Sequence, residues 1–147
     1  MYRELLTPYL KEYTYAVLQE PCSEETIQKA EKAVGLPFPQ ELKTLLRETN
    51  GDRWLLLSAD EIAENAHLNR QCFENADDDE KALWEPLKHL LLFATNGCGD
   101  YYGYLFADDG SVKDGIYLWE HEDFRYKKVA ENIADLIRKY YNNEVIE

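Results

Sequence analysis

The sequence predicts a single α+β domain in which helices flank an antiparallel sheet formed by the C-terminal half. Its 147 residues are the usual length of one domain. Apolar residues recur at helical spacing in the first half and near the C-terminus, whereas residues 90–119 hold three short runs with strand patterns. Strands that are segregated from helices in this way are typical of the α+β class. We expect one domain over residues 1–147, with residues 1–21 as an N-terminal helical extension.

The first two predicted helices are marked by proline, capping residues and glycine. Residues 1–20 have a helical spacing of apolar residues that Pro8 interrupts, so an irregular helix is expected to pack on the domain. Ser23 is a typical N-cap and Gly35 a typical C-cap for the second helix. Residues 36–39 contain two prolines and must be extended, because each proline restricts the residue before it.

A third helix and a short strand are predicted next. The helix begins at Pro39, since the missing N–H of proline is not needed at a first helical position, and it ends at Asn50-Gly51. Residues 54–57 form a short apolar run, which predicts a buried strand.

A fourth helix is predicted from a capping-box signature. Ser58 provides the cap and Glu61 reaches back to its backbone, so a helix is expected from Ala59 toward Cys72. The acidic residues 74–80 after it predict a solvated loop.

The C-terminal half predicts three strands and a final helix. Residues 90–95 are continuously apolar, as in a strand buried on both faces, residues 101–106 alternate, and residues 116–119 form the third run. Short glycine- and aspartate-rich turns join the strands, which must therefore be antiparallel neighbours. Apolar residues at helical offsets predict the final helix: Val129, Ile133, Leu136, Ile137 and Tyr140.

The net charge limits the partners of the chain. It carries 29 acidic and 16 basic residues, a formal charge of -13. Nucleic acids and anionic membranes are bound mainly through Lys and Arg, so neither is expected as a direct partner. A basic protein would be attracted, although acidity also serves solubility. The net charge is -2 over residues 1–50, -7 over residues 51–100 and -4 over residues 101–147, so we expect the binding face on the later two thirds.

The apolar runs and the cysteines predict the cellular location of the protein and the redox state of its thiols. No apolar run is long enough to cross a bilayer, and the N-terminus has no signal-peptide pattern. The cysteines at positions 22, 72 and 98 are odd in number and widely spaced, so neither a disulfide framework nor a structural zinc site is expected. These features predict free thiols in a cytoplasmic protein.

No residue pattern predicts a catalytic or cofactor site. Gly97-x-Gly99 follows a strand but leads into another strand pattern, whereas a dinucleotide-binding loop must lead into a helix. Cys98 would need a neighbouring histidine to act as a nucleophile, and the sequence places none beside it. We expect no catalytic residues, no cofactor and no metal.

Eleven tyrosines and three tryptophans are the unusual feature of the composition. Tyr and Trp are favoured anchors in protein interfaces, and several lie on neighbouring predicted strands beside acidic residues. One face of these strands should pack under the helices, and the aromatic side chains on the other face are a candidate partner surface. The alternative is that the rings form core and cross-strand pairs. The candidate partner-binding residues are Asp100, Tyr102, Tyr104, Asp108, Asp109, Tyr117, Trp119, Glu120 and Glu122.

Two blocks of the sequence resemble the SUKH superfamily of Smi/Knr-like domains, and the similarity covers residues 22–141. The family has a helix, a Gly-x-x-Leu-Pro-like break and a second helix that ends in Asn-Gly, followed later by a strand-turn-strand block. Here the Leu-Pro follows the glycine directly. The matching residues are Gly35-Leu36-Pro37-Phe38-Pro39 and Thr49-Asn50-Gly51 in the first block, and Leu92-Phe93-Ala94, Asn96-Gly97 and Gly99-Asp100-Tyr101-Tyr102-Gly103-Tyr104 in the second.

The resemblance implies a non-catalytic α+β domain that binds another protein. Bacterial members are mostly immunity proteins that neutralise toxins delivered between competing cells, often nucleases, so a basic, nuclease-like toxin is the implied partner. Fungal relatives act as cell-wall and signalling scaffolds, which makes a regulatory module the alternative. An enzyme that uses Cys98 or clustered carboxylates is a third hypothesis. The resemblance implies structural roles for Gly35, Pro37, Asn50, Gly51, Gly97 and Gly99.

Overall fold

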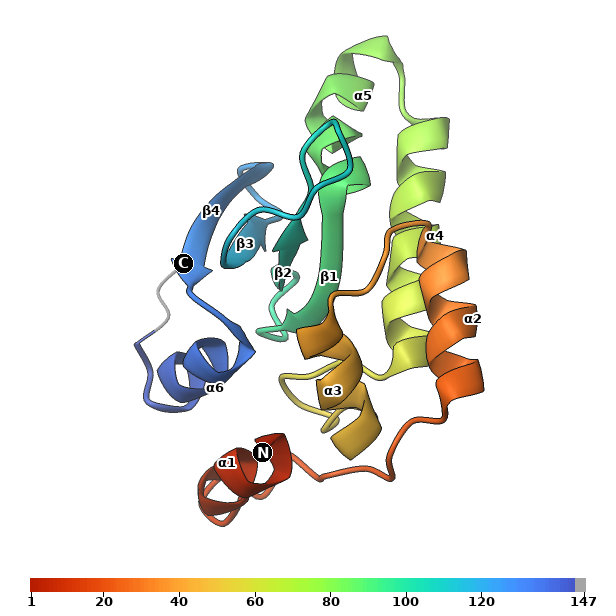
Figure 1. Ribbon diagram of the computed structural model, residues 1–147. Coiled ribbons are helices and arrows are strands. Elements are labelled where there is room, and N and C mark those ends of the chain that lie inside the picture. Colours follow the sequence, from red (N-terminus) through yellow and green to blue (C-terminus); the bar gives the residue numbers. More distant parts are fainter. Residues whose placement is uncertain (145–147) are drawn as a thin grey trace.

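The predicted α+β class is confirmed by the computed structural model, which describes residues 1–144 (Figure 1). None of the helices in these residues combines the length and the apolar character that a membrane span requires. The elements in chain order are α1 (Tyr2–Leu10), α2 (Glu24–Val34), α3 (Gln40–Glu48), α4 (Ala59–Asn75), α5 (Asp78–Trp84), the 3-10 helix η1 (Glu85–His89), β1 (Leu90–Thr95), β2 (Tyr101–Leu105), β3 (Ile116–Glu120), β4 (Arg125–Ala130) and α6 (Ile133–Tyr141).

The caps predicted for α2 and α4 are confirmed. The Ser23 side chain accepts a backbone N–H of the first turn of α2, and Gly35 ends that helix with a φ of 83°. At α4, the Ser58 side chain accepts the N–H of Glu61, and the Glu61 carboxylate accepts the N–H of Ser58 at 2.9 Å. Both halves of the capping box are therefore present. Pro39 is the N-cap of α3 rather than its first residue, a shift of one position.

The strands form an antiparallel meander in the order β1-β2-β3-β4. The alternation predicted for β2 is confirmed, because Tyr102 and Tyr104 lie on one face of the sheet and Leu105 on the other. The first face belongs to the main core, which also contains side chains of α1, α2, α3, α4 and α6. Figure 1 shows the helices around the sheet. The opposite face forms a smaller cluster with Leu87 of η1 and Trp119 of β3.

Residues 54–57 do not form the predicted strand. Leu56 makes an isolated bridge to Ala94 of β1. The reason is the buried carboxylate of Asp52, which accepts the N–H of Trp54 at 2.9 Å and the N–H of Leu56 at 2.8 Å. These bonds curl the backbone around Asp52. Residues 55–57 still reach the edge of β1, where Leu55 accepts the N–H of Thr95 and Leu57 donates its N–H to Phe93, but they make a single bridge rather than a strand.

The loop predicted for residues 74–80 is wrong, because helices occupy five of its seven residues. Helix α4 continues to Asn75, and α5 starts at Asp78. Asp77 caps α5, since its side chain accepts the N–H of Glu80 at 2.8 Å. Carboxylates in a first turn are stabilised by the positive end of the helix dipole, so this acidic run forms a helix start.

A fourth strand, β4, lies where the final helix was predicted to begin, and Val129 belongs to this strand. Ala130 is buried and Val129 half-buried, whereas the first four residues of the strand are exposed, so no apolar alternation marks it. Helix α6 begins after Asn132, whose side chain accepts the N–H of Asp135 at 2.8 Å. The meander therefore has four strands rather than the three predicted.

Candidate protein-interaction site

The prediction of an exposed aromatic surface on the sheet is wrong for three of its four rings. Tyr102, with 1% of its surface exposed, and Tyr104 lie in the main core, and Trp119, with 3% exposed, lies in the cluster on the opposite face. The Tyr104 hydroxyl donates a hydrogen bond of 2.7 Å to the carboxylate of Glu41. Both faces of the sheet are covered, so these side chains cannot contact a partner directly.

Two acidic residues of the same candidate set are also buried and are used within the fold. Asp100 accepts the backbone N–H of His121 at 3.0 Å and lies 2.7 Å from Nδ1 of that side chain, which joins the turn after β1 to the turn after β3. Glu120 lies 3.4 Å from Arg125 and 3.6 Å from Lys127 on the neighbouring strand β4. Both carboxylates therefore serve the sheet rather than a free surface.

The remaining candidates do not form one surface. Asp108 and Asp109 are exposed in the turn between β2 and β3, and Glu122 is exposed in the turn between β3 and β4. In a meander these turns lie at opposite ends of β3. Tyr117 is half-buried, and its ring centroid lies 6.3 Å from that of Tyr126.

The residues of the resemblance motif lie at breaks and turns. The Asn50 side chain accepts the N–H of Ala59 at 2.8 Å, which ties the end of α3 to the start of α4. Gly51 has a φ of 82°, and a Cβ atom there would lie 2.8 Å from the backbone nitrogen of Ser58. Gly97 and Gly99 both have positive φ in the turn between β1 and β2. Pro37 is exposed in the break between α2 and α3.

The densest exposed negative charge lies on α4, α5 and η1, residues 59–89, which we call the acidic segment. All of its carboxylates are exposed, and among the described residues only Glu85 forms an ion pair, with Lys88 at 3.4 Å. The acidic segment lies within residues 51–100, the stretch with the most negative net charge, whereas most of the candidate residues predicted from the sequence lie after it. Its acidic residues are Asp60, Glu61, Glu64, Glu74, Asp77, Asp78, Asp79, Glu80 and Glu85.

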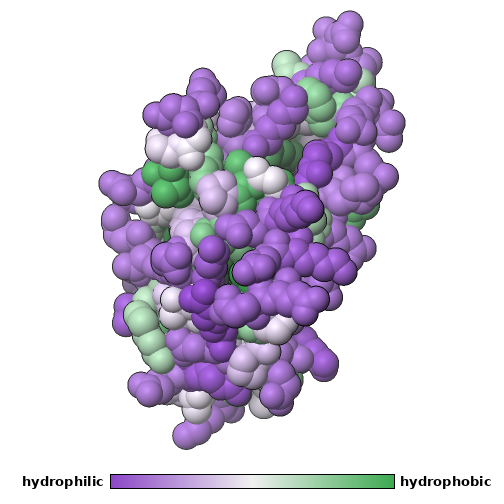
Figure 2. Space-filling model, turned by 45° about the vertical axis from the view of Figure 1, so that its right-hand side comes forward, coloured by the Kyte–Doolittle hydropathy of each residue, from purple (hydrophilic) through white to green (hydrophobic). Residues whose placement is uncertain are grey.

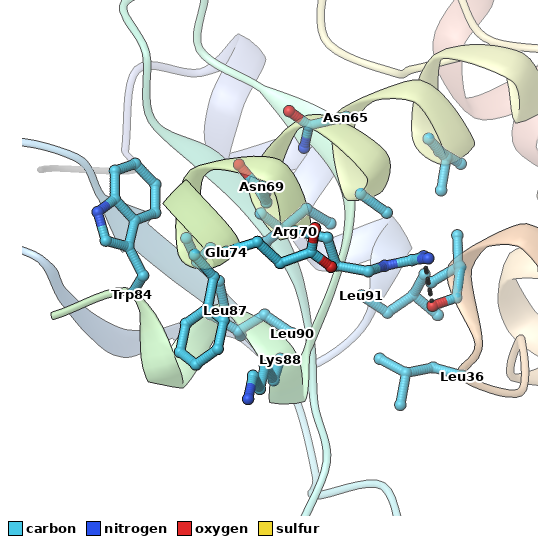
Figure 3. A pocket seen from close by; sticks show the side chains of 15 residues that line it. Leu36, Asn65, Asn69, Arg70, Glu74, Trp84, Leu87, Lys88, Leu90 and Leu91 are labelled. Atoms are coloured by element: carbon cyan, nitrogen blue, oxygen red, sulfur yellow. Dashed lines mark hydrogen bonds between the residues drawn. The ribbon is translucent and has the colours of Figure 1, made fainter. Parts of the chain in front are cut away.

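A groove with a volume of about 330 Å³ adjoins the acidic segment (Figure 3). Helix α4 forms one wall, α5 and η1 form the other, β1 forms the floor, and the end of α2 contributes to the lining. Figure 2 shows apolar side chains gathered among hydrophilic ones on the upper part of this side of the molecule. The apolar residues of the groove include Val34, Leu36, Phe73, Trp84, Leu87 and Leu91.

Both cations of the groove already have partners. Arg70 of α4 donates to the backbone carbonyl oxygens of Ala33 and Val34, and its side chain extends across the groove toward α2 (Figure 3). The Nζ atom of Lys88 lies 3.7 Å from the centroid of the Phe73 ring. Glu74, in contrast, forms no ion pair with any described residue. The free charge at the rim is therefore negative.

Comparison with known protein families shows which family the domain belongs to. Residues 21–139 match the SMI1 / KNR4 family (SUKH-1). The chain belongs to the SMI1/KNR4 family. The resemblance drawn from the two sequence blocks is thereby confirmed. The SMI1/KNR4 match includes the whole acidic segment and the groove, whereas α1 lies before it. No curated protein matches the chain.

Proposed function

We propose that this SMI1/KNR4 protein is an immunity protein that binds and neutralises a basic, nuclease-like toxin. The observation that carries the proposal is the acidic segment, a set of exposed and largely unpaired carboxylates on a domain of this family. A nuclease must attract phosphate, so its active cleft is basic. Carboxylates mounted on helices can enter such a cleft in place of the nucleic acid backbone.

The proposed mechanism is blockade, and no bond is made or broken. Opposite charge steers the encounter, and association of this kind can reach about 10⁸ M⁻¹s⁻¹ or more at low salt. The protein acts in the cytoplasm, where the toxin would otherwise reach nucleic acid. Neither nucleic acid nor a membrane is bound directly, and no cofactor takes part.

The buried carboxylate of Asp52 and the half-buried one of Glu41 support a non-catalytic role, because the fold uses them. Asp52 accepts two backbone N–H groups, and the Tyr141 hydroxyl donates to its second oxygen at 3.1 Å. Burial raises the pKa of the Asp52 carboxyl, although these hydrogen bonds oppose the rise. The Glu41 carboxylate accepts from the Tyr104 hydroxyl and from the N–H of Ile133. Each of these carboxylates holds distant segments together.

Co-expression with a basic toxin encoded beside this gene tests the proposed function. We expect the chain to restore growth, and the purified chain to abolish nuclease activity at a one-to-one molar ratio. A catalytically inactive toxin gives the growth expected of full protection. Undiminished toxin activity in the presence of a large molar excess of the chain would contradict the proposal. Capture of a resident cellular protein under the same conditions would favour a scaffold role instead.

A further inference from the structure

We propose that the groove between α4 and η1 receives an amphipathic, basic helix of the partner protein. This inference depends on the proposed function only in identifying that partner as the toxin. It is argued from the shape of the groove, from its apolar walls and from the charges at its rim.

The shape of the groove suits a helix. On α4 the lining residues extend from Ile62 to Glu74 and include Ala66, Asn69 and Phe73, at the spacing of one helical face. Twelve intervals of 1.5 Å make this wall about 18 Å long, which is roughly three helical turns. A helix laid in an apolar groove contacts it through residues three and four positions apart along such a length.

The walls are apolar and already in place. Leu87 and Leu90 are largely buried at the base, whereas Leu36, Phe73 and Trp84 are half-buried. The Trp84 ring is held in place by Phe124, because the two rings pack edge-on with their centroids 5.1 Å apart. Apolar side chains of a partner would remove the half-exposed rings from water without rearranging the wall.

The charges at the rim select a basic helix over an acidic one. Arg70 and Lys88 are engaged with carbonyl oxygens, a carboxylate and a ring within the protein, so they offer little to an anionic partner. Glu74 is exposed at the rim of the groove. Asp78 and Asp79 are exposed in the first turn of α5, beyond the residues that line the groove. Lysine and arginine beside the apolar stripe of the incoming helix would meet these carboxylates, whereas acidic residues would be repelled.

Two synthetic peptides and two variants test the inference without the toxin. An amphipathic leucine–lysine helix is titrated into the full chain carrying ¹³C-labelled leucine methyl groups, and a leucine–glutamate helix of the same pattern is the control. We expect the lysine peptide to shift the methyl resonances of Leu36, Leu87 and Leu91. The glutamate peptide should leave them unchanged.

The variant Asn69→Trp fills the groove from α4, and Gln71→Trp places the same ring on an exposed position of that helix outside the lining. We expect Asn69→Trp to weaken lysine-peptide binding by at least about tenfold and Gln71→Trp to leave it unchanged. If Asn69→Trp does not fold, Asn65→Trp, at another lining position, provides the same test.

Each outcome separates this inference from the proposed function. Shifts outside the groove, equal shifts with both peptides, or full binding to a folded groove-filling variant would overturn the inference. Toxin neutralisation that survives Asn69→Trp would overturn it as well and leave the proposed function standing. If the chain binds the lysine peptide in the groove but fails to neutralise the toxin, the inference that the groove binds a basic helix is supported. Only the proposed function is then contradicted.

Discussion

Reversing three charges of the acidic segment, with Glu74→Lys, Asp78→Lys and Asp79→Lys, is expected to slow association with a basic toxin by about 10–100-fold at low ionic strength. All three side chains are exposed, and none forms an ion pair with a described residue. Glu74 also lines the groove. The variant therefore replaces three of the nine carboxylates of the acidic segment with positive charges, which weakens the attraction of that segment for a basic partner. Stopped-flow association at several salt concentrations measures the effect.

A second triple, Glu12→Lys, Glu20→Lys and Asp114→Lys, changes the net charge by the same amount at exposed positions outside the acidic segment. We expect it to slow association much less, because steering depends on where the charge lies as well as on its sum. The difference between the two triples should shrink as salt rises and screens the charges. Equal slowing by both triples would show that net charge alone matters, and no slowing by either would exclude electrostatic steering.

Gly103→Ala is expected to destabilise the fold by about 3 kcal/mol or more, a large part of the stability of a typical domain. In β2, a Cβ atom at this position would lie 2.0 Å from the carbonyl oxygen of Leu91 and 2.7 Å from its carbonyl carbon. These are backbone atoms of the paired strand β1, where Gly103 lies opposite Leu92. They cannot move aside as a flexible side chain would, so β1 and β2 must separate.

Gly97→Ala is the matched control for that substitution. Gly97 lies in the turn between the same two strands, and a Cβ atom there would meet no other atom within 4 Å. Its φ of 80° still disfavours alanine, so a cost of about 1 kcal/mol is expected. Urea unfolding of both variants gives the comparison. A loss of stability for Gly103→Ala no greater than that for Gly97→Ala would contradict the account of the β1–β2 pairing.

The elements that could be predicted from the sequence are those with local signals. Ser23 and Gly35 bound α2, and Ser58 starts α4, because caps act within one helical turn. Strand β4 carries no such signal. Its exposed Arg125 and Lys127 are ordered against Glu120 across the strand pair, a contact that becomes visible only when the sheet is assembled.

The candidate site was harder to predict, because exposure depends on segments distant in sequence. Alternation assigned Tyr102 and Tyr104 to one face, and Leu105 to the other, but it could not show that both faces are covered. Leu87 of η1 and Phe124 of the turn after β3 complete the second cluster. The acidic run that begins at Asp77 predicts a loop as readily as a helix start, since helix caps and solvated loops favour the same residues.

Hydrogen–deuterium exchange of the free chain and of its complex with the toxin tests the central claim most directly, namely that α4, α5 and η1 form the partner-binding face. The account predicts slower exchange over residues 59–89 in the complex, with little change over residues 101–122. Unchanged exchange in α4, α5 and η1, together with protection confined to β2, β3 or the turns that join them, would contradict it.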